Sequence, residues 1–455
     1  MHEKLLAKTG NMGIFGQSLT LGWILINTAN NMQKPTRRRF LKSTGLSLAA
    51  AGFLPVLGAA FPDPNQPDMP TFFPDDSNTS LIGQYGPWAA SLNGNRIPAL
   101  SFREPKWKKP DKWRKTARKR VLDRMAPPEM PGLPDVKVVR QFIYDGLHIE
   151  ELTWQLPYGP PTEAVFLKPA DATGKLPAIL AFHDHGGNKY FGAQKIVKTD
   201  RQHPLMIPHQ ETYYSGRAWA NEIAKQGYAV LVPDAFPFAS RRVLLKDVPQ
   251  HLRGKLTDPT DDNHDSISAY NQWAGQHEHI MAKSLFCAGT TWPGVFFAED
   301  QKALDILCSR PDVDAERVGC CGLSGGGMRT VFMGGLDERI RCAVAVGFMT
   351  TWQDFMLNKA HTHTWMVYVP ILPNELDFPE ILGLRAPLPT LVLNDSEDQL
   401  YTLPEMQSAD QILAQVFEKA GAADRYKCSY YPGPHKFDAD MQAEAFAWFD
   451  RWLKG

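Results

Sequence analysis

Ser324 lies in a glycine-dense stretch, RVGCCGLSGGGMRT, that extends from Arg317 to Thr330. Glycines at positions 322 and 326 give the local pattern GxSxG. In this pattern the serine sits on a tight strand-to-helix turn, which closes only where neighbouring side chains are absent. We therefore predict a nucleophile at Ser324. From this stretch alone, a glycine-rich turn that only packs or binds phosphate stays open as the alternative.

His435 and a carboxylate are the expected partners of this serine. Serine becomes a good nucleophile only when a base takes its proton and a carboxylate orients that base. His435 lies in YYPGPHKF, between the last predicted strand and the last predicted helix. The acid should come from the loop after the strand predicted at 390–393, where three carboxylates crowd together. We choose Asp398, because residues 399–401 follow it as the chain turns toward the next helix. Asp395 is second and Glu397 third, and the two that do not act are expected to form the turn, where Asp and Ser are favoured.

Two backbone N–H groups are the expected donors to the oxyanion that forms when the serine attacks an acyl carbon. One belongs to Gly325, which follows the nucleophile at the positive end of the next helix. The other should come from the loop HDHGG, which follows the strand predicted at 177–182. We choose the N–H of His185, with Gly186 as the neighbouring candidate.

Histidines also occur as HxH pairs, which place two rings on one side of a strand and could bind a metal. The pairs are at positions 183 and 185, 277 and 279, and 361 and 363. We identify no third ligand for any pair, and the spacing typical of zinc proteases is missing. We therefore predict no metal and no other cofactor.

Apolar runs and helical patterns alternate along the part of the chain that must position these residues. Strands are predicted at 138–144, 148–155, 164–167, 177–182, 228–232, 318–321, 342–346, 390–393 and 427–431. Helices are predicted at 217–226, 299–308, after Ser324, at 405–420 and at 439–453. This alternation predicts an α/β fold with a mostly parallel central sheet and helices on both faces.

Two longer stretches interrupt the alternation, at 236–292 and 350–389. Long irregular insertions in a compact domain are typically lids or substrate-binding loops. Both follow strands whose carboxyl ends should line the active crevice. We therefore predict two lid-like insertions.

The chain has 12 tryptophans, and four of them lie in these insertions, at 273, 292, 352 and 365. This surplus is compatible with sugar stacking, although core packing is the default explanation. We name Trp292, Trp352 and Arg329 as candidate substrate-binding residues. Arg329 and Lys189 could attract a uronic acid carboxylate, although local salt bridging explains them at least as well.

Residues 1–60 are predicted to be a targeting segment. Arginines at 37–39, in TRRRFLK, match the twin-arginine export pattern, and the apolar run STGLSLAAAGFLPVL follows them. Residues 1–31 precede this pattern, and signal peptides seldom carry an extension of this kind at their N-terminus. We therefore expect translation to start at Met32. The earlier apolar run at 14–26 is too short for a membrane span. We therefore expect the twin-arginine machinery to export the protein to the periplasm or the cell exterior.

The rest of the chain divides into two parts. Residues 61–136 are rich in Pro and Asp and contain one helical candidate at 112–125, which predicts a Pro-rich N-terminal arm. Residues 137–455 form the predicted catalytic domain.

The charge of the chain is balanced, with 49 basic and 49 acidic residues, so no nucleic-acid partner is implied. A disulfide such as Cys308 to Cys342 stays open for an exported protein.

With serine, acid and histidine in this order, the chain resembles the α/β-hydrolase superfamily. The segments FHDHGGNKYFG, TTWPG, CGLSGGGMRT, LDERI and FMTTW resemble the bacterial dienelactone-hydrolase-like and acetyl-xylan-esterase-like group. That group includes exported carbohydrate esterases and pectin methylesterases, and its triad carries over onto Ser324, Asp398 and His435. A dienelactone hydrolase proper would carry Cys at the nucleophile position, so Ser324 favours esters of alcohols and acids.

The function predicted from the sequence is an exported serine esterase that removes acyl or methyl groups from plant or algal polysaccharide. A serine peptidase of the prolyl-oligopeptidase type is the second hypothesis, although an N-terminal region of β-propeller length is missing. A catalytically inactive, glycan-binding protein on the same scaffold is the third hypothesis.

Overall fold

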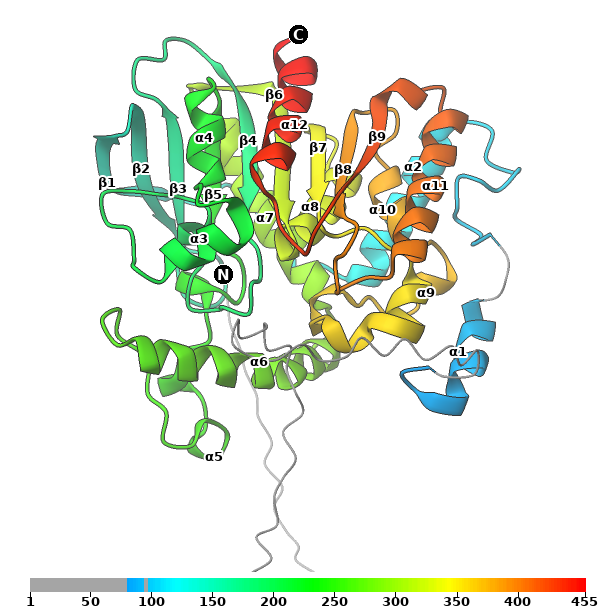
Figure 1. The fold of residues 1–455 in the computed structure, drawn as a ribbon, viewed down its shortest axis with the longest axis horizontal. Helices are drawn as coiled ribbons and strands as arrows, with labels where there is room; N and C mark the ends of the chain where they lie inside the picture. Colours follow the sequence, from blue (N-terminus) through cyan, green and yellow to red (C-terminus); the bar gives the residue numbers. More distant parts are fainter. Residues whose placement is uncertain (1–79, 94–96) are drawn as a thin grey trace, which may run out of the picture. The chain divides into compact units, whose positions relative to one another are not determined.

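The computed structural model describes residues 80–93 and 97–455 (Figure 1). They belong to one compact unit, Val56–Gly455. The predicted targeting segment, its twin arginines and the expected start at Met32 lie outside the described residues, as do residues 61–79 and 94–96 of the predicted arm. The boundary at residue 136 stays a prediction.

A nine-stranded sheet forms the centre of this unit, in the order β1-β2-β3-β5-β4-β6-β7-β8-β9. Its strands are β1 (Val136–Tyr144), β2 (Leu147–Trp154), β3 (Thr162–Pro169), β4 (Leu176–Phe182), β5 (Ala229–Pro233), β6 (Val313–Leu323), β7 (Ile340–Val346), β8 (Thr390–Asp395) and β9 (Tyr426–Tyr431). The pairs among β1, β2, β3 and β5 are antiparallel, and the five remaining pairs are parallel. The predicted mostly parallel sheet is therefore confirmed.

Helices surround the sheet, as the alternating sequence pattern predicted (Figure 1). They are α1 (Gly86–Asn93), α2 (Pro110–Met125), α3 (Met206–Tyr214), α4 (Trp219–Lys225), α5 (Gln250–Arg253), α6 (His264–Cys287), α7 (Trp292–Ser309), α8 (Gly325–Leu336), α9 (Trp352–Asp354), α10 (Phe378–Gly383), α11 (Leu403–Lys419) and α12 (Ala439–Phe449). Parallel strands must be covered on both faces because both of their faces are apolar.

Two buried clusters fill the two faces of the sheet. One packs α2, α7, α8, α10 and α11 against the strands, and the other packs α3, α4 and α12. Side chains of β6 alternate between them, so Cys320 belongs to the first cluster and Cys321 to the second. The strand that leads to Ser324 is thus held from both sides by close packing.

The stretch at 236–292 is more regular than the sequence predicted. It contains the 24-residue helix α6, whose buried side chains include Ile267, Tyr270, Ala274, Glu278 and Ala282. Their spacing of three or four residues is that of one helix face. The stretch at 350–389 instead contains short helical turns and α10. A lid role for either stretch stays a prediction.

The cysteines do not form the disulfide that the sequence left open. All six thiols are free, and Cys342 is buried in β7. Among the described helices, none combines the length and apolar character of a membrane span.

Candidate active site

Ser324 lies between β6 and α8, at a turn with strained backbone. Its φ of 59° and ψ of −120° are unusual for a residue with a side chain. A methyl group at Gly322 would lie 2.5 Å from the carbonyl oxygen of Phe182, and one at Gly326 would lie 2.3 Å from the same atom. Only glycine fits at both positions, because the end of β4 passes so close to the turn.

His435 contacts one of the three candidate carboxylates. Its Nδ1 lies 2.6 Å from Oδ2 of Asp398, whose side chain is 1% exposed. The other oxygen of Asp398 accepts the N–H of Leu400 at 2.9 Å. Burial opposes a charged imidazole, but the charge and hydrogen bond of Asp398 outweigh it and raise the pKa of His435. The carboxylate thus orients the ring and favours its protonated form.

Ser324 and the imidazole of His435 both lie beside the end of β7. The N–H of Ser324 donates to the carbonyl of Val346 at 2.9 Å. A methyl group on the next residue, Gly347, would lie 2.9 Å from Cε1 of His435. Nε2 of His435 is buried and has no hydrogen-bond partner among the described residues. The nitrogen that is not engaged by Asp398 is therefore free to exchange a proton.

The other two carboxylates of the loop occupy different surroundings. Oδ2 of Asp395 accepts the N–H of Lys436 at 3.0 Å, and burial raises the pKa of Asp395 to about 7. Glu397 is exposed and accepts the N–H of Gly433 at 3.3 Å. Neither carboxylate makes the direct contact with His435 that Asp398 makes.

Asp395, Asp398 and His435 are also the described residues best placed to hold a metal ion. One potential ligand atom from each lies within 4.8 Å of the others. Two carboxylates and one imidazole suit a divalent cation chemically. Nδ1 of His435 is engaged by Asp398, so an ion bound through that nitrogen and that carboxylate would compete with their contact.

The loop after β4 passes over the start of α8. A methyl group at Gly325 would lie 3.1 Å from the backbone nitrogen of His185. The first N–H groups of a helix lack partners inside the helix. The structure therefore brings the two expected backbone donors, on Gly325 and His185, close together. Gly186 has a φ of 51°, and a methyl group there would lie 2.4 Å from Oδ2 of Asp184, so Gly186 is required by the turn.

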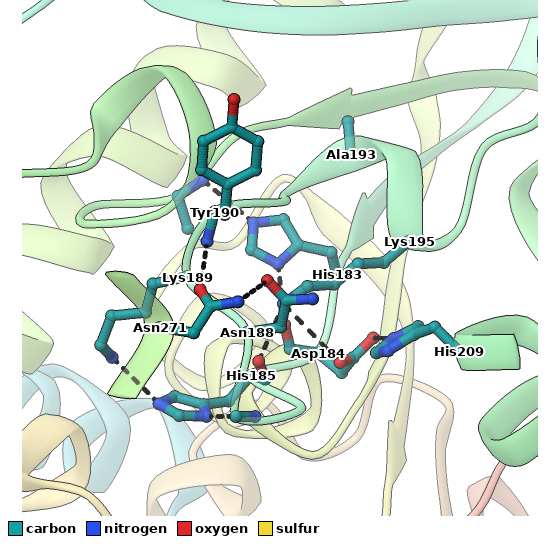
Figure 2. Close-up of polar contacts among 12 residues, drawn as sticks. His183, Asp184, His185, Asn188, Lys189, Tyr190, Ala193, Lys195, His209 and Asn271 are labelled. Carbon is teal, nitrogen blue, oxygen red and sulfur yellow. Dashed lines mark hydrogen bonds and ion pairs between the residues drawn. The ribbon is translucent and has the colours of Figure 1, made fainter. Parts of the chain in front are cut away.

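The side chains of His183 and Asp184 hold this loop in place through hydrogen bonds and ion pairs (Figure 2). Nε2 of His183 accepts the N–H of Ala235 at 3.1 Å, and its Nδ1 donates to the Asp184 carbonyl. The Asp184 carboxylate contacts His209 at 3.2 Å and the hydroxyl of Tyr214 at 2.5 Å. These contacts are internal to the fold, so the side chains of His183 and Asp184 have structural roles.

Lys195 completes the support of the loop. Its ammonium donates to the carbonyls of Asp184 and His185, both at 2.8 Å, and the side chain is fully buried. Burial lowers the pKa of Lys195 to about 8, although Asp184 opposes that effect. The sequence analysis did not single out this lysine, because its partners become apparent only once the loop is folded.

The structure corrects the substrate-binding candidates. Trp292 and Trp352 are 1% and 5% exposed and pack in the core, where Nε1 of Trp352 donates to the Leu376 carbonyl. Arg329 is 3% exposed and its guanidinium contacts Asp300 through two hydrogen bonds of 2.9 and 2.5 Å. None of the three offers an open face to a polysaccharide, so the default explanations of packing and salt bridging hold.

Glu278 is a second residue that the sequence analysis missed. It lies between the histidines of the pair at 277 and 279, which drew attention only as a metal candidate. In the structure Glu278 contacts His185, whereas Nδ1 of His279 donates to the carbonyl of Gln276 in its own helix at 2.8 Å. Glu278 falls on the face of the helical pattern that carries the apolar residues, and a carboxylate at such a position needs a buried partner. This was the signal in the sequence that could have identified it.

Comparison with known proteins shows which proteins this chain is similar to. A family model described as "Prolyl oligopeptidase family" matches residues 289–381, which include Ser324 but less than half of the chain. The Bacillus subtilis (strain 168) protein named "Putative hydrolase YtaP" is 26% identical over 293 residues, covering 64% of this chain and 83% of its own.

Solved structures of low sequence identity share the fold. A "putative acetyl xylan esterase" from Bacteroides fragilis NCTC 9343 superposes with a TM-score of 0.56 at 19% identity, covering 79% of this chain and 87% of its own. A glucuronoyl esterase from Solibacter usitatus superposes with a TM-score of 0.52 at 16% identity, covering 79% and 98%. By its sheet, its serine turn and these matches, the chain has the α/β-hydrolase fold.

Proposed function

We propose that the protein is an exported serine esterase that hydrolyses acetyl or methyl esters carried by plant or algal polysaccharide. The observation that carries the esterase part is the hydrogen bond between His435 and Asp398 beside the strained turn at Ser324. A nucleophile, a base and an acid that orients the base are the parts that acyl transfer through a serine requires.

The chemistry follows from these positions. Nε2 of His435 takes the proton of the Ser324 hydroxyl as the oxygen attacks the ester carbonyl. The N–H groups of Gly325 and His185 stabilise the negative oxygen of the tetrahedral intermediate. His435 then protonates the departing alcohol, and water repeats the sequence on the acyl-enzyme to release the acid. Asp398 stabilises the imidazolium at each stage.

The polysaccharide part of the proposal rests on weaker support. The two structural relatives named above are called esterases of xylan acetyl groups and of glucuronoyl groups. Function lives in sites that differ between proteins of one fold, so these names only suggest which esters to try first. Export by the twin-arginine machinery belongs to the same proposal, and a mature protein that keeps Arg37 to Arg39 in its native host would contradict it.

The proposal is tested by removing the hydroxyl at Ser324. In the Ser324→Ala variant we expect kcat for p-nitrophenyl acetate to fall by a factor on the order of 10⁴ or more, with an unchanged melting temperature. Ser408→Ala, on the exposed side of α11, is the matched control and should keep full turnover. Turnover retained in Ser324→Ala would refute the assigned nucleophile.

The substrate is tested with a panel of acetylated xylan, methylated pectin and short acyl esters. Release of acetate or methanol from one polymer at a higher kcat/KM than from the short esters would support the polysaccharide part. Equal or faster cleavage of the short esters would contradict it while leaving the esterase part intact.

A serine peptidase is the second candidate, and the match of residues 289–381 to the prolyl oligopeptidase family favours it. The same three side chains can cleave an amide bond. A proline-containing peptide p-nitroanilide distinguishes the two activities, because a peptidase would cleave it with a kcat/KM above that for p-nitrophenyl acetate. Binding of a glycan without any turnover would instead indicate an inactive binding protein.

A further inference from the structure

The side chain of His185 contacts a buried ion pair formed by Lys189 and Glu278. Nε2 of His185 lies 3.1 Å from Oε1 of Glu278 and 3.0 Å from Nζ of Lys189, and the ammonium also contacts Oε1 of Glu278. Figure 2 shows Lys189 directed toward the His185 ring. The Lys189 and Glu278 side chains are 3% and 8% exposed. The ion pair is therefore almost closed to water, and the His185 side chain that contacts it is 19% exposed.

Hydrogen bonding fixes which nitrogen of His185 carries the hydrogen. Nδ1 accepts the N–H of Gly187 at 3.0 Å, so the hydrogen of the neutral ring lies on Nε2 and is donated to Glu278. Burial and the Lys189 charge lower the pKa of His185 to about 4. Burial alone would raise the pKa of Glu278, but Lys189 lowers it to about 2. A neutral donor and an ionised acceptor therefore meet, with the charge balanced by Lys189.

Glu278 reaches the loop from α6, which also contacts it through Asn271. Oδ1 of Asn271 accepts the N–H of Tyr190 at 2.9 Å, and Nδ2 donates to Oδ1 of Asn188 at 2.8 Å. Figure 2 shows the Asn271 amide between these two residues. Asn271 and Glu278 are seven residues apart, which is two turns on the same helix face. One face of α6 thus holds both sides of the loop that carries His185.

The anchored ring is close to the backbone atom that matters for the proposed chemistry. A methyl group at Gly325 would lie 3.1 Å from the backbone nitrogen of His185 and 3.3 Å from its Cβ. The whole residue therefore rests against the start of α8. Donors to an oxyanion must be held within a few tenths of an ångström, because a displaced donor stabilises the transition state less.

We infer that Glu278, with Lys189, is a positioning residue that holds the His185 N–H in place beside Gly325. This inference rests on the proposed esterase function for its kinetic consequence, but the anchoring itself does not depend on any activity. Glu278 acts through the His185 side chain, so substrate binding should not require it.

The test compares Glu278→Gln with the wild-type protein and with Glu150→Gln. Glu150 is also buried and accepts two hydrogen bonds, of 2.9 and 3.0 Å, from Arg310, but it lies on β2. The double variant Lys189→Met with Glu278→Gln removes both charges together. It replaces Glu278→Gln in the same measurements if the single variant does not fold. Each protein is assayed with p-nitrophenyl acetate, and hydrogen exchange of peptides spanning residues 183–191 is measured by mass spectrometry.

We expect Glu278→Gln or the double variant to lower kcat by a factor of about 10 to 100, with KM changed less than about twofold. Amide exchange in the peptides spanning 183–191 should rise in these variants but not in Glu150→Gln. Unchanged kcat, unchanged exchange, or an equal loss of kcat in Glu150→Gln would overturn the inference. If the wild type cleaves no ester, the proposed function fails, and the exchange difference alone supports or overturns the anchoring.

Discussion

The loop after β4 and the loop after β9 both contribute to the candidate site, but they are held in different ways. The first is fixed by buried charged side chains: Lys195 holds the carbonyls of Asp184 and His185, and the ion pair of Lys189 with Glu278 holds the His185 ring. The second carries His435, whose ring is held through a single nitrogen by Asp398.

The contrast follows from what each loop must present. A backbone N–H keeps one chemical form throughout a reaction, so it gains from being fixed as rigidly as the fold allows. An imidazole that exchanges protons must keep one nitrogen free and must remain stable in both protonation states. The fold therefore surrounds the loop that carries the His185 N–H with buried charged side chains, whereas it gives the His435 imidazole one partner, Asp398.

The largest effect should come from the loop that carries His435. Asp398→Asn preserves the shape of the side chain, but it removes the charge that stabilises the imidazolium and disturbs the hydrogen on Nδ1. We expect kcat for p-nitrophenyl acetate to fall by a factor of about 10³ to 10⁴. Asp395→Asn is the matched control and should change kcat by less than about threefold. A larger loss in Asp395→Asn than in Asp398→Asn would reverse the assignment of the acid.

A smaller effect on rate, but a larger one on stability, should come from the loop after β4. Lys195→Met keeps the buried volume and leaves two carbonyls and Asp184 without their cation. We expect the free energy of unfolding in urea to fall by about 3–5 kcal/mol, because the variant removes one partner of a buried charged group. Lys119→Met, which breaks an exposed ion pair with Asp123, is the control and should leave the free energy of unfolding nearly unchanged. Equal losses in the two variants would show that the buried cation has no special role.

The smallest effect expected is a shift in the pH dependence of the rate. The base must be neutral, and the pKa of His435 is raised above its ordinary value, so the rate should fall on acidification with an apparent pKa above about 6.5. In Asp398→Asn the raising charge is gone while burial remains, so the residual activity should persist to lower pH. A profile of kcat/KM against pH tests this prediction. If the apparent pKa on the acidic side were the same in the variant and the wild type, Asp398 would not be the cause of the raised pKa of His435.

The sequence was sufficient for the centre of the sheet because the buried parallel strands there are continuous apolar runs. A parallel strand buried on both faces, such as Pro177 to Phe182, differs from its surroundings over many residues at once. The turn at Ser324 was equally visible, because close approach of the β4 end leaves glycine as the residue that fits on either side. Both are local features, and local features can be read from adjacent residues.

The support of the loop after β4 could not be predicted in the same way. His185 and Glu278 are 93 residues apart, and Asp184 and His209 are 25 apart, so their pairing depends on how α6 and α3 pack. A carboxylate within a helical pattern shows that a partner is needed but not which one. The prediction that Trp292 and Trp352 bind substrate was wrong for a related reason. Tryptophans that stack on sugars and tryptophans that fill a core cannot be told apart by residue type alone.

Helix α6 limits how freely this scaffold can be re-engineered. The stretch that contains it, 236–292, is a natural target for exchange between relatives by anyone who wishes to transplant a substrate preference. Asn271 and Glu278 also tie that stretch to the loop that carries His185. A chimaera would have to retain these two side chains at their two-turn spacing, whereas the outward side of the helix could be diversified in a library.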